Sequence, residues 1–133
     1  MSDCLFCKII DGNIPAKKVY EDDRTFAFQD INPQAPTHVL IIPKKHVVDI
    51  KSAAPGDAEL IGYCQLVAAK IAKERGLEGG FRTMYNVKPD AEQTVFHLHL
   101  HLLVVVAHWT RTHGDELGAS VLRDLAYGFD AVL

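Results

Sequence analysis

Histidine and leucine alternate along residues 97–102, and this is the most regular pattern of polar and apolar positions in the chain. On a β-strand, residues two apart lie on the same face, so three imidazoles would share one face and three leucines the other. On a helix, the middle histidine would point away from the other two. The pattern therefore predicts a strand over residues 96–106 that presents His97, His99 and His101 together.

Weaker patterns predict the other elements. Short apolar segments predict strands over residues 17–21, 25–29, 38–42 and 81–86. Asp22-Asp23 predicts a hairpin turn between the first two. Apolar residues at helical spacing predict one long helix over residues 56–75, namely Leu60, Cys64, Val67 and Ile71, and a fainter helical pattern covers residues 115–127. Hairpin-like strands with one long helix are typical of an α+β fold with a mostly antiparallel sheet.

Length and composition indicate one soluble domain. The 133 residues suffice for a single domain over residues 1–133, and 48% hydrophobic with 23% charged residues is ordinary for a globular protein. The net charge of −3 gives no attraction to nucleic acid or to an anionic membrane, so neither is an expected partner. No apolar run approaches a membrane span, and no secretory signal is visible at the N-terminus. We therefore expect a cytoplasmic protein.

Three histidines on one strand face suggest chemistry, because imidazole changes protonation near neutral pH. The alternative is a half-buried strand whose polar face happens to be histidine, yet histidine rarely fills three successive positions of a face. A metal site, an acid–base site and a nucleophile all fit. As a nucleophile toward phosphorus, His99 would need one ring nitrogen free and the other held by an acceptor. The available donors to a phosphate are Asn86, Gln93, Thr94 and the backbone N–H groups of residues 90–94.

Cys4 and Cys7 form a Cys-x-x-Cys pair near the N-terminus. Without a secretory signal, such a pair indicates metal or redox chemistry rather than a structural disulfide. Two further ligands would complete a tetrahedral zinc site, and His46 and His97 are candidates, but spacing alone does not choose among seven histidines. A reduced, partly buried pair is the alternative. A redox role is the weakest interpretation, because no thioredoxin-like strand and helix flank the pair.

Taken singly, other residues near these motifs have simpler structural explanations. Phe28, Ile31 and Leu40 fit a hydrophobic core, and Asp30 fits the cap of a turn. His38 fits an ordinary position within a strand, and Asn86 fits a capping position at the end of a strand.

The segment His97-Leu98-His99-Leu100-His101 resembles the His-x-His-x-His signature of the histidine triad (HIT) family, most of all its Hint branch of nucleoside phosphoramidases. Further segments match that family in order, at residues 4–10, 14–17, 20–24, 30–38 and 42–46, so the likeness covers residues 4–103. The resemblance implies a roughly five-stranded antiparallel sheet with one long helix and a short N-terminal helix. It also implies a homodimer in which the sheets of two protomers join.

The resemblance further implies a purine nucleotide site, in which His99 attacks the α-phosphate and forms a nucleotidyl-histidine intermediate that water hydrolyses. His101 and Thr94 complete the implied catalytic set, with Thr94 beside the leaving group. The implied substrate-binding residues, with apolar side chains around the base and Asp30 at the ribose, are Phe6, Phe28, Asp30, Ile31, His38, Leu40, Asn86 and Gln93. The implied cofactor is one structural zinc ion per chain, with no position open for chemistry, on Cys4, Cys7, His46 and His97.

Two features depart from the family pattern. Glu92 stands where the family usually has a glycine that lets backbone N–H groups approach the phosphate. Its carboxylate could face solvent and leave those donors usable, or face inward and repel the phosphate. Residues 104–133 form an atypical tail that begins Val104-Val105-Val106 where the family has Gly-Gly-Arg. Loss of one G from the Gly-Gly-Arg codons gives this sequence, so we hypothesise a frameshift, which the nucleotide sequence of the source locus tests.

Two functions of different classes compete on these grounds. The first is a nucleoside phosphoramidase or nucleotide hydrolase, favoured by the intact His99 and Thr94. The second is a nucleotide-binding regulator with little or no hydrolase activity, favoured by Glu92 and the atypical tail. Hydrolysis of dinucleoside polyphosphates is a third interpretation within the same chemistry, and the Hint-like segments at residues 4–10 and 30–38 make it less favoured.

Overall fold

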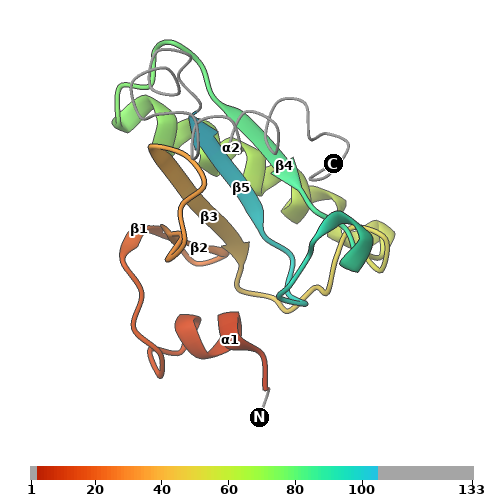
Figure 1. Cartoon of the computed structure of the whole chain (residues 1–133). Coiled ribbons are helices and arrows are strands. Elements are labelled where there is room, and N and C mark those ends of the chain that lie inside the picture. The colour runs from red at the N-terminus through yellow and green to blue at the C-terminus, as the bar shows by residue number, and fades with distance from the viewer. Residues whose placement is uncertain (1–2, 105–133) are drawn as a thin grey trace.

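Five antiparallel strands form one sheet in the order β1-β2-β3-β5-β4 in the computed structural model, which describes residues 3–104 (Figure 1). The strands are β1 (Lys18–Glu21), β2 (Thr25–Gln29), β3 (Thr37–Pro43), β4 (Arg82–Tyr85) and β5 (Leu100–Val104). The predicted five-stranded antiparallel sheet of an α+β fold is thereby confirmed. β3 lies at the centre and pairs with both β2 and β5, so it carries side chains from the N-terminal half to the histidine segment.

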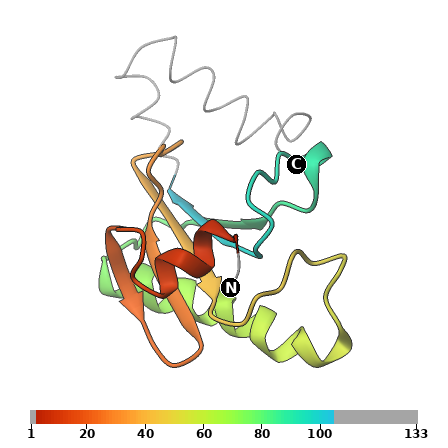
Figure 2. The ribbon, with the colours of Figure 1, turned by 90° about the horizontal axis from the view of Figure 1, so that it is seen from below.

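The long helix α2 (Ala58–Glu74) covers one face of the sheet and confirms the helix predicted over residues 56–75. A 3-10 turn, Pro55–Asp57, precedes it. Three residues of the predicted apolar stripe are almost fully buried, namely Cys64, Val67 and Ile71. They pack with alternate residues of the strands, among them Val39, Ile41, Leu100 and Leu102. Figure 2 shows α2 running beneath the strands and the short α1 (Leu5–Ile10) lying separately from it.

The opposite face of the sheet holds a second apolar cluster beneath α1. Phe6 and Ile9 of α1 pack with side chains from β2 and β3, namely Phe26, Phe28, Leu40 and Ile42. Strand alternation separates these residues from those facing α2. In the register of β3 and β5, Leu40 lies opposite His101 and His38 opposite Leu103. The two strands therefore bring His38 and His101 to the α1 face.

The histidine segment corrects one prediction, because β5 begins at Leu100 and not at residue 96. Only His101 of the three histidines lies in the strand, whereas His97 and His99 precede it. β3 ends at Pro43, so this segment bonds to the last residue of β3 and to the loop that follows it. The His97 Nε2–H donates to the Pro43 carbonyl at 2.8 Å, and the Leu98 N–H donates to the Val47 carbonyl at 2.6 Å. The predicted extension to residue 106, the fainter helix over 115–127 and almost all of the 104–133 tail lie outside the described residues.

The predicted hairpin turn between β1 and β2 is confirmed and is held by Asp22. Its carboxylate accepts hydrogen bonds from the N–H groups of Arg24 and Thr25, and from the hydroxyls of Thr25, Tyr20 and Tyr63. Burial raises the pKa of Asp22, but these donors outweigh burial and hold the pKa far below its usual range. Tyr63 belongs to α2, so the turn is tied to the helix.

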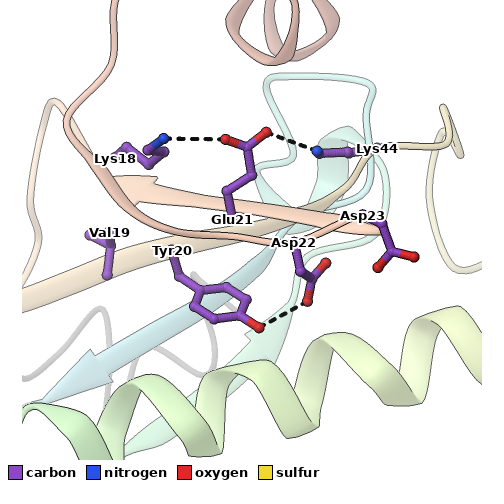
Figure 3. A pocket seen from close by; sticks show the side chains of 7 residues that line it. All are labelled: Lys18, Val19, Tyr20, Glu21, Asp22, Asp23 and Lys44. Carbon is purple, nitrogen blue, oxygen red and sulfur yellow. Dashed lines mark hydrogen bonds and ion pairs between the residues drawn. The ribbon is translucent and has the colours of Figure 1, made fainter.

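A shallow surface pocket beside this turn contains Glu21 between two lysines (Figure 3). Glu21 pairs with Lys44 at 2.8 Å and with Lys18 at 3.3 Å. Exposed pairs of this kind contribute little to stability. Within residues 3–104, no helix has the length and apolar character needed to cross a membrane.

Candidate active site and metal centre

A cleft of about 1280 Å³ opens on the α1 face of the sheet. Its walls come from α1, the ends of β2 and β4, the strands β3 and β5, and the loop over residues 89–95. Every residue that the sequence predicted for catalysis or substrate binding lines it: Phe6, Phe28, Asp30, Ile31, His38, Leu40, Asn86, Gln93, Thr94, His99 and His101. The fold thus brings together residues that are up to 95 positions apart along the chain.

His99 has one ring nitrogen held and the other unbonded. Its Nδ1 lies 2.7 Å from the His97 carbonyl oxygen, and a carbonyl only accepts, so Nδ1 carries the proton. In the neutral ring, Nε2 then holds the lone pair, and it makes no hydrogen bond within residues 3–104. The Phe6 ring packs edge-on against His99, with centroids 5.1 Å apart. His99 therefore has the tautomer that a nucleophilic Nε2 requires.

His38 and His101 form a directed hydrogen-bond chain beside His99. The Gln34 N–H donates to His38 Nδ1 at 3.0 Å, so the His38 proton is on Nε2. That nitrogen lies 2.9 Å from His101 Nδ1 and 3.4 Å from the Asp30 carboxylate. His101 Nδ1 consequently accepts, and its Nε2 carries a proton that has no partner among the described residues. The chain makes His101 Nε2 a hydrogen-bond donor.

The position of the His38 proton also shows whether the cleft residues suit a metal ion. Two clusters of the described residues contain metal-ligand side chains, and one of them lies in this cleft. Asp30, His38 and His101 offer ligand atoms close together, but the Gln34 N–H keeps the proton of His38 on the Nε2 atom that a cation would need. These three residues therefore suit a hydrogen-bonded chain and not a metal site.

The three imidazoles of the cleft are buried, and burial lowers their pKa values. It lowers the pKa of His101 to about 3, helped by the nearby His99 and His38. It also lowers the pKa of His99 and of His38, although the Asp30 carboxylate partly opposes the shift in both. Neutral imidazoles follow for all three near pH 7.

The apolar wall of the cleft is built on an aromatic pair. Phe6 and Phe28 meet edge-to-face with centroids 5.4 Å apart, and Leu40 is buried beside them. Ile31 lines the same cleft but is 99% exposed, so it lies at the rim and not in the core. Leu5, which the sequence did not single out, is a second exposed apolar residue at this rim.

The loop before the histidines uses most of its own donors, which corrects a second prediction. The N–H groups of Ala91 and Gln93 donate to the Lys88 carbonyl, and that of Glu92 donates to the Pro89 carbonyl. They are therefore not available to a phosphate in this conformation. The N–H and hydroxyl of Thr94 make no hydrogen bond within residues 3–104.

Gln93 maintains the loop rather than offering its amide to the cleft. Its Oε1 accepts from the Lys88 N–H, and its Nε2 donates to the carbonyls of Val48 and Val95. Asn86 has the opposite situation, because its buried Oδ1 has no partner among the described residues. Asn86 thus has a hydrogen-bonding atom to spare in the cleft.

Two residues of this loop adopt backbone conformations that favour glycine. Glu92 has φ 62° and ψ 30°, and Lys88 has φ 69° and ψ 171°, a region almost confined to glycine. The Glu92 side chain is exposed, which supports the alternative in which its carboxylate faces solvent. Lys88 is held by an ion pair, since its Nζ lies 2.8 Å from Asp49, which is fully buried.

The Lys88–Asp49 pair escaped the sequence analysis, because 39 residues separate its members and neither lies in a motif. The Lys88 hydrogen bond, with help from Ser52, holds the pKa of Asp49 below its usual range. A buried carboxylate of this kind needs its cation, so the pair anchors the loop that carries Thr94.

Cys4, Cys7, His46 and His97 converge on one point, as the sequence predicted for a metal site. The Nδ1 atom of His97 lies 3.3 Å from the Cys4 sulfur, 3.5 Å from the Cys7 sulfur and 3.1 Å from His46 Nδ1. Ligand atoms around a tetrahedral zinc ion are roughly 3.3–3.8 Å apart, given its ordinary bond lengths.

The hydrogen bonds of His97 also fit metal binding. Its Nε2–H donates to the Pro43 carbonyl, which leaves the lone pair on the Nδ1 atom inside the cluster. The Cys7 N–H donates to the Cys4 sulfur at 3.4 Å, which keeps that sulfur beside the cluster. The residues present therefore suit a tetrahedral cation that prefers sulfur and nitrogen ligands.

Comparison with known proteins gives a consistent result. The HIT domain family matches residues 11–108. A 14 kDa zinc-binding protein of Zea mays is 47% identical over 104 residues, covering 77% of this chain and 81% of the relative. The crystal structure of a HIT family hydrolase from Legionella pneumophila is 50% identical, with TM-score 0.75 over 77% of this chain and 92% of that one. A histidine triad protein from Clostridium difficile is 46% identical, with TM-score 0.75 over 77% and 90%.

Replacing Glu92 by glycine is expected to stabilise the protein, because it removes backbone strain and the exposed side chain makes no hydrogen bond or ion pair among the described residues. We expect a gain of about 0.5–1 kcal/mol in the free energy of unfolding, measured by urea titration. Lys88→Gly is the matched control, since it also relieves backbone strain but leaves the buried Asp49 carboxylate without its ion-pair partner. It should lose about 2 kcal/mol. A destabilising Glu92→Gly or a stabilising Lys88→Gly would contradict this account of the loop.

Proposed function

This chain belongs to the HIT domain family, and on that premise we propose that it is a hydrolase of purine nucleoside phosphoramidates or related nucleotides. The observation that carries the proposal is the arrangement of His99 in the cleft. Its Nδ1–H is held by a carbonyl, its Nε2 is unbonded, and its ring lies 5.0 Å from the ring of His101, which offers a donor. The hydrolase named in the Legionella pneumophila structure supports the same chemistry.

In the proposed binding mode, the nucleotide lies along the cleft from its apolar wall to the histidines. The base packs against Phe6 and Phe28 with Leu40 behind them and Ile31 at the rim. The Asp30 carboxylate accepts from the ribose hydroxyls. The α-phosphate then lies between His99 and His101, with Asn86 at its side.

The proposed reaction has two displacements at phosphorus. The lone pair of His99 Nε2 forms a bond to the α-phosphorus while the bond to the leaving group breaks. The Thr94 hydroxyl hydrogen-bonds the leaving group, which takes a proton from solvent water as it departs. A water molecule then attacks the phosphorus and gives one proton to solvent, the bond to Nε2 breaks, and the nucleoside monophosphate leaves. His101 Nε2–H donates to a phosphate oxygen as charge develops on it. His38 and Asp30 keep the His101 proton in place.

A nucleotide-binding regulator remains the second candidate. The observation that favours it is the loop over residues 88–94, where three N–H groups are used internally and a carboxylate stands at the rim. Fewer donors to the phosphate would weaken stabilisation of the transition state more than binding of the ground state.

His99→Ala is expected to lower turnover of an adenosine phosphoramidate by roughly 10⁴-fold or more, because no other imidazole that lines the cleft within residues 3–104 has an unbonded lone pair. AMP release measures turnover, and mass spectrometry after an early quench should show a transient gain of one AMP in the wild type alone. Circular dichroism and AMP binding check that the variant is folded. Appreciable turnover in the variant would contradict the covalent mechanism, and a wild type that binds AMP without adduct or release would favour the regulator.

We also propose that Cys4, Cys7, His46 and His97 hold one structural zinc ion per chain. The ion would tie α1 to the histidine segment, and four protein ligands would leave it no position for substrate. Elemental analysis should find one zinc per wild-type chain and none in Cys4→Ser. The control is Cys64→Ser, a buried cysteine of α2 whose replacement should keep the metal. Wild-type protein prepared without chelator that contains no zinc would end this proposal.

A homodimer that joins two sheets through β4 is the third part of the proposal. The sheet has two outer strands, and β1 is protected by a bulge and by the charges of Lys18 and Glu21. β4 pairs with β5 in regular register and is the better edge for addition. Light scattering should give twice the 14.7 kDa of one chain. A monomer mass at micromolar concentration would contradict a stable dimer.

A further inference from the structure

His97 connects the proposed metal centre to the proposed nucleophile through one residue. Its imidazole Nδ1 lies among the cluster atoms, and its backbone carbonyl accepts the hydrogen bond that fixes the proton of His99. The imidazole is fully buried, and its other nitrogen is bonded to Pro43. The orientation of the peptide group that faces His99 therefore depends on what holds the His97 ring.

Two sides hold this segment, and the proposed cation would act on one of them. From the β3 side, the carbonyls of Pro43 and Val47 bond His97 Nε2 and the Leu98 N–H. From the α1 side, the restraint comes from the two cysteines and from Phe6 between them. The Phe6 ring lies 5.9 Å from His97 and 5.1 Å from His99, so a shift of α1 would reach both rings.

We propose that Cys4, Cys7 and His46 are positioning residues for the reaction, and that the cation they hold with His97 locks the tautomer of His99. This inference rests on the proposed hydrolase and on the proposed metal site. With the cation bound, the His97 carbonyl stays in place and His99 keeps its proton on Nδ1. Without it, the His97 ring and α1 lose their shared anchor, the carbonyl loosens, and the proton can occupy Nε2, where it blocks attack on phosphorus.

His46 is the informative position to change. Its side chain is exposed, it does not line the cleft, and within residues 3–104 its ring bonds and packs with Cys7 and His97. An effect of His46→Ala on His99 must therefore pass through the cluster. Lys51→Ala, another exposed position in the segment between β3 and α2, is the matched control.

The experiment compares zinc-loaded wild type, chelator-treated wild type, His46→Ala and Lys51→Ala, all with ¹⁵N-labelled histidine at one neutral pH. Long-range ¹H–¹⁵N spectra report which ring nitrogen of His99 carries the proton, and thermal unfolding confirms that each form is folded. We expect the proton on Nδ1 in the loaded wild type and in Lys51→Ala. The chelated protein and His46→Ala should show a mixture of tautomers and a kcat about tenfold lower, with KM changed less.

The possible outcomes distinguish a failure of this inference from a failure of the proposed hydrolase or of the proposed metal site. If metal is bound but its removal leaves the His99 spectrum and kcat unchanged, the coupling is wrong while the metal site and the hydrolase stand. If the wild type binds no zinc, the metal site and the coupling both fail. If no form turns over, the hydrolase fails, and the tautomer spectra alone support or overturn the coupling. A loss of kcat that follows only from unfolding, with the tautomer unchanged, also overturns it.

Discussion

The hydrogen bond from His99 Nδ1 to the His97 carbonyl is the interaction on which the whole site depends. At 2.7 Å it places the only ring proton of His99 away from the cleft and leaves Nε2 able to accept or attack. Its geometry exists because the chain leaves strand pairing before Leu100. In a regular strand, the His97 carbonyl would point along the sheet toward a neighbouring strand. The late start of β5, at Leu100, therefore creates the site.

The same physical rule organises the second layer of the cleft. A backbone N–H can only donate, so the Gln34 N–H bonded to His38 Nδ1 leaves the His38 proton on Nε2. That proton is donated to His101 Nδ1, so the His101 proton is on its own Nε2. A backbone carbonyl can only accept, so Pro43 leaves the His97 lone pair in the cysteine cluster. Chemically identical side chains thus acquire different roles, because each backbone group beside them can only donate or only accept. The four histidines concerned are His38, His97, His99 and His101.

The loop over residues 88–94 shows how a strained backbone is retained. Lys88 and Glu92 occupy conformations suited to glycine, and each costs of the order of 1 kcal/mol or more. The ion pair between Lys88 and the buried Asp49 offsets part of this strain energy. The Gln93 side chain also stabilises the loop by accepting a hydrogen bond from the Lys88 N–H. Glu92 makes no side-chain hydrogen bond or ion pair within residues 3–104, and it is the residue that departs from the family pattern.

The sequence by itself determined the elements and the membership of the cleft. Alternation along residues 97–102 and the apolar stripe through Cys64, Val67 and Ile71 reflect interactions between near neighbours, which local pattern captures, while the family motifs supplied the cleft residues. Tertiary structure decided what each residue does there. It removed His97 and His99 from the strand, consumed the loop N–H groups, and placed Cys4 beside His97, 93 residues away. Those outcomes depend on single backbone atoms contributed by distant segments, such as the Pro43 carbonyl and the Gln34 N–H, and no spacing of residue types encodes where such atoms will lie.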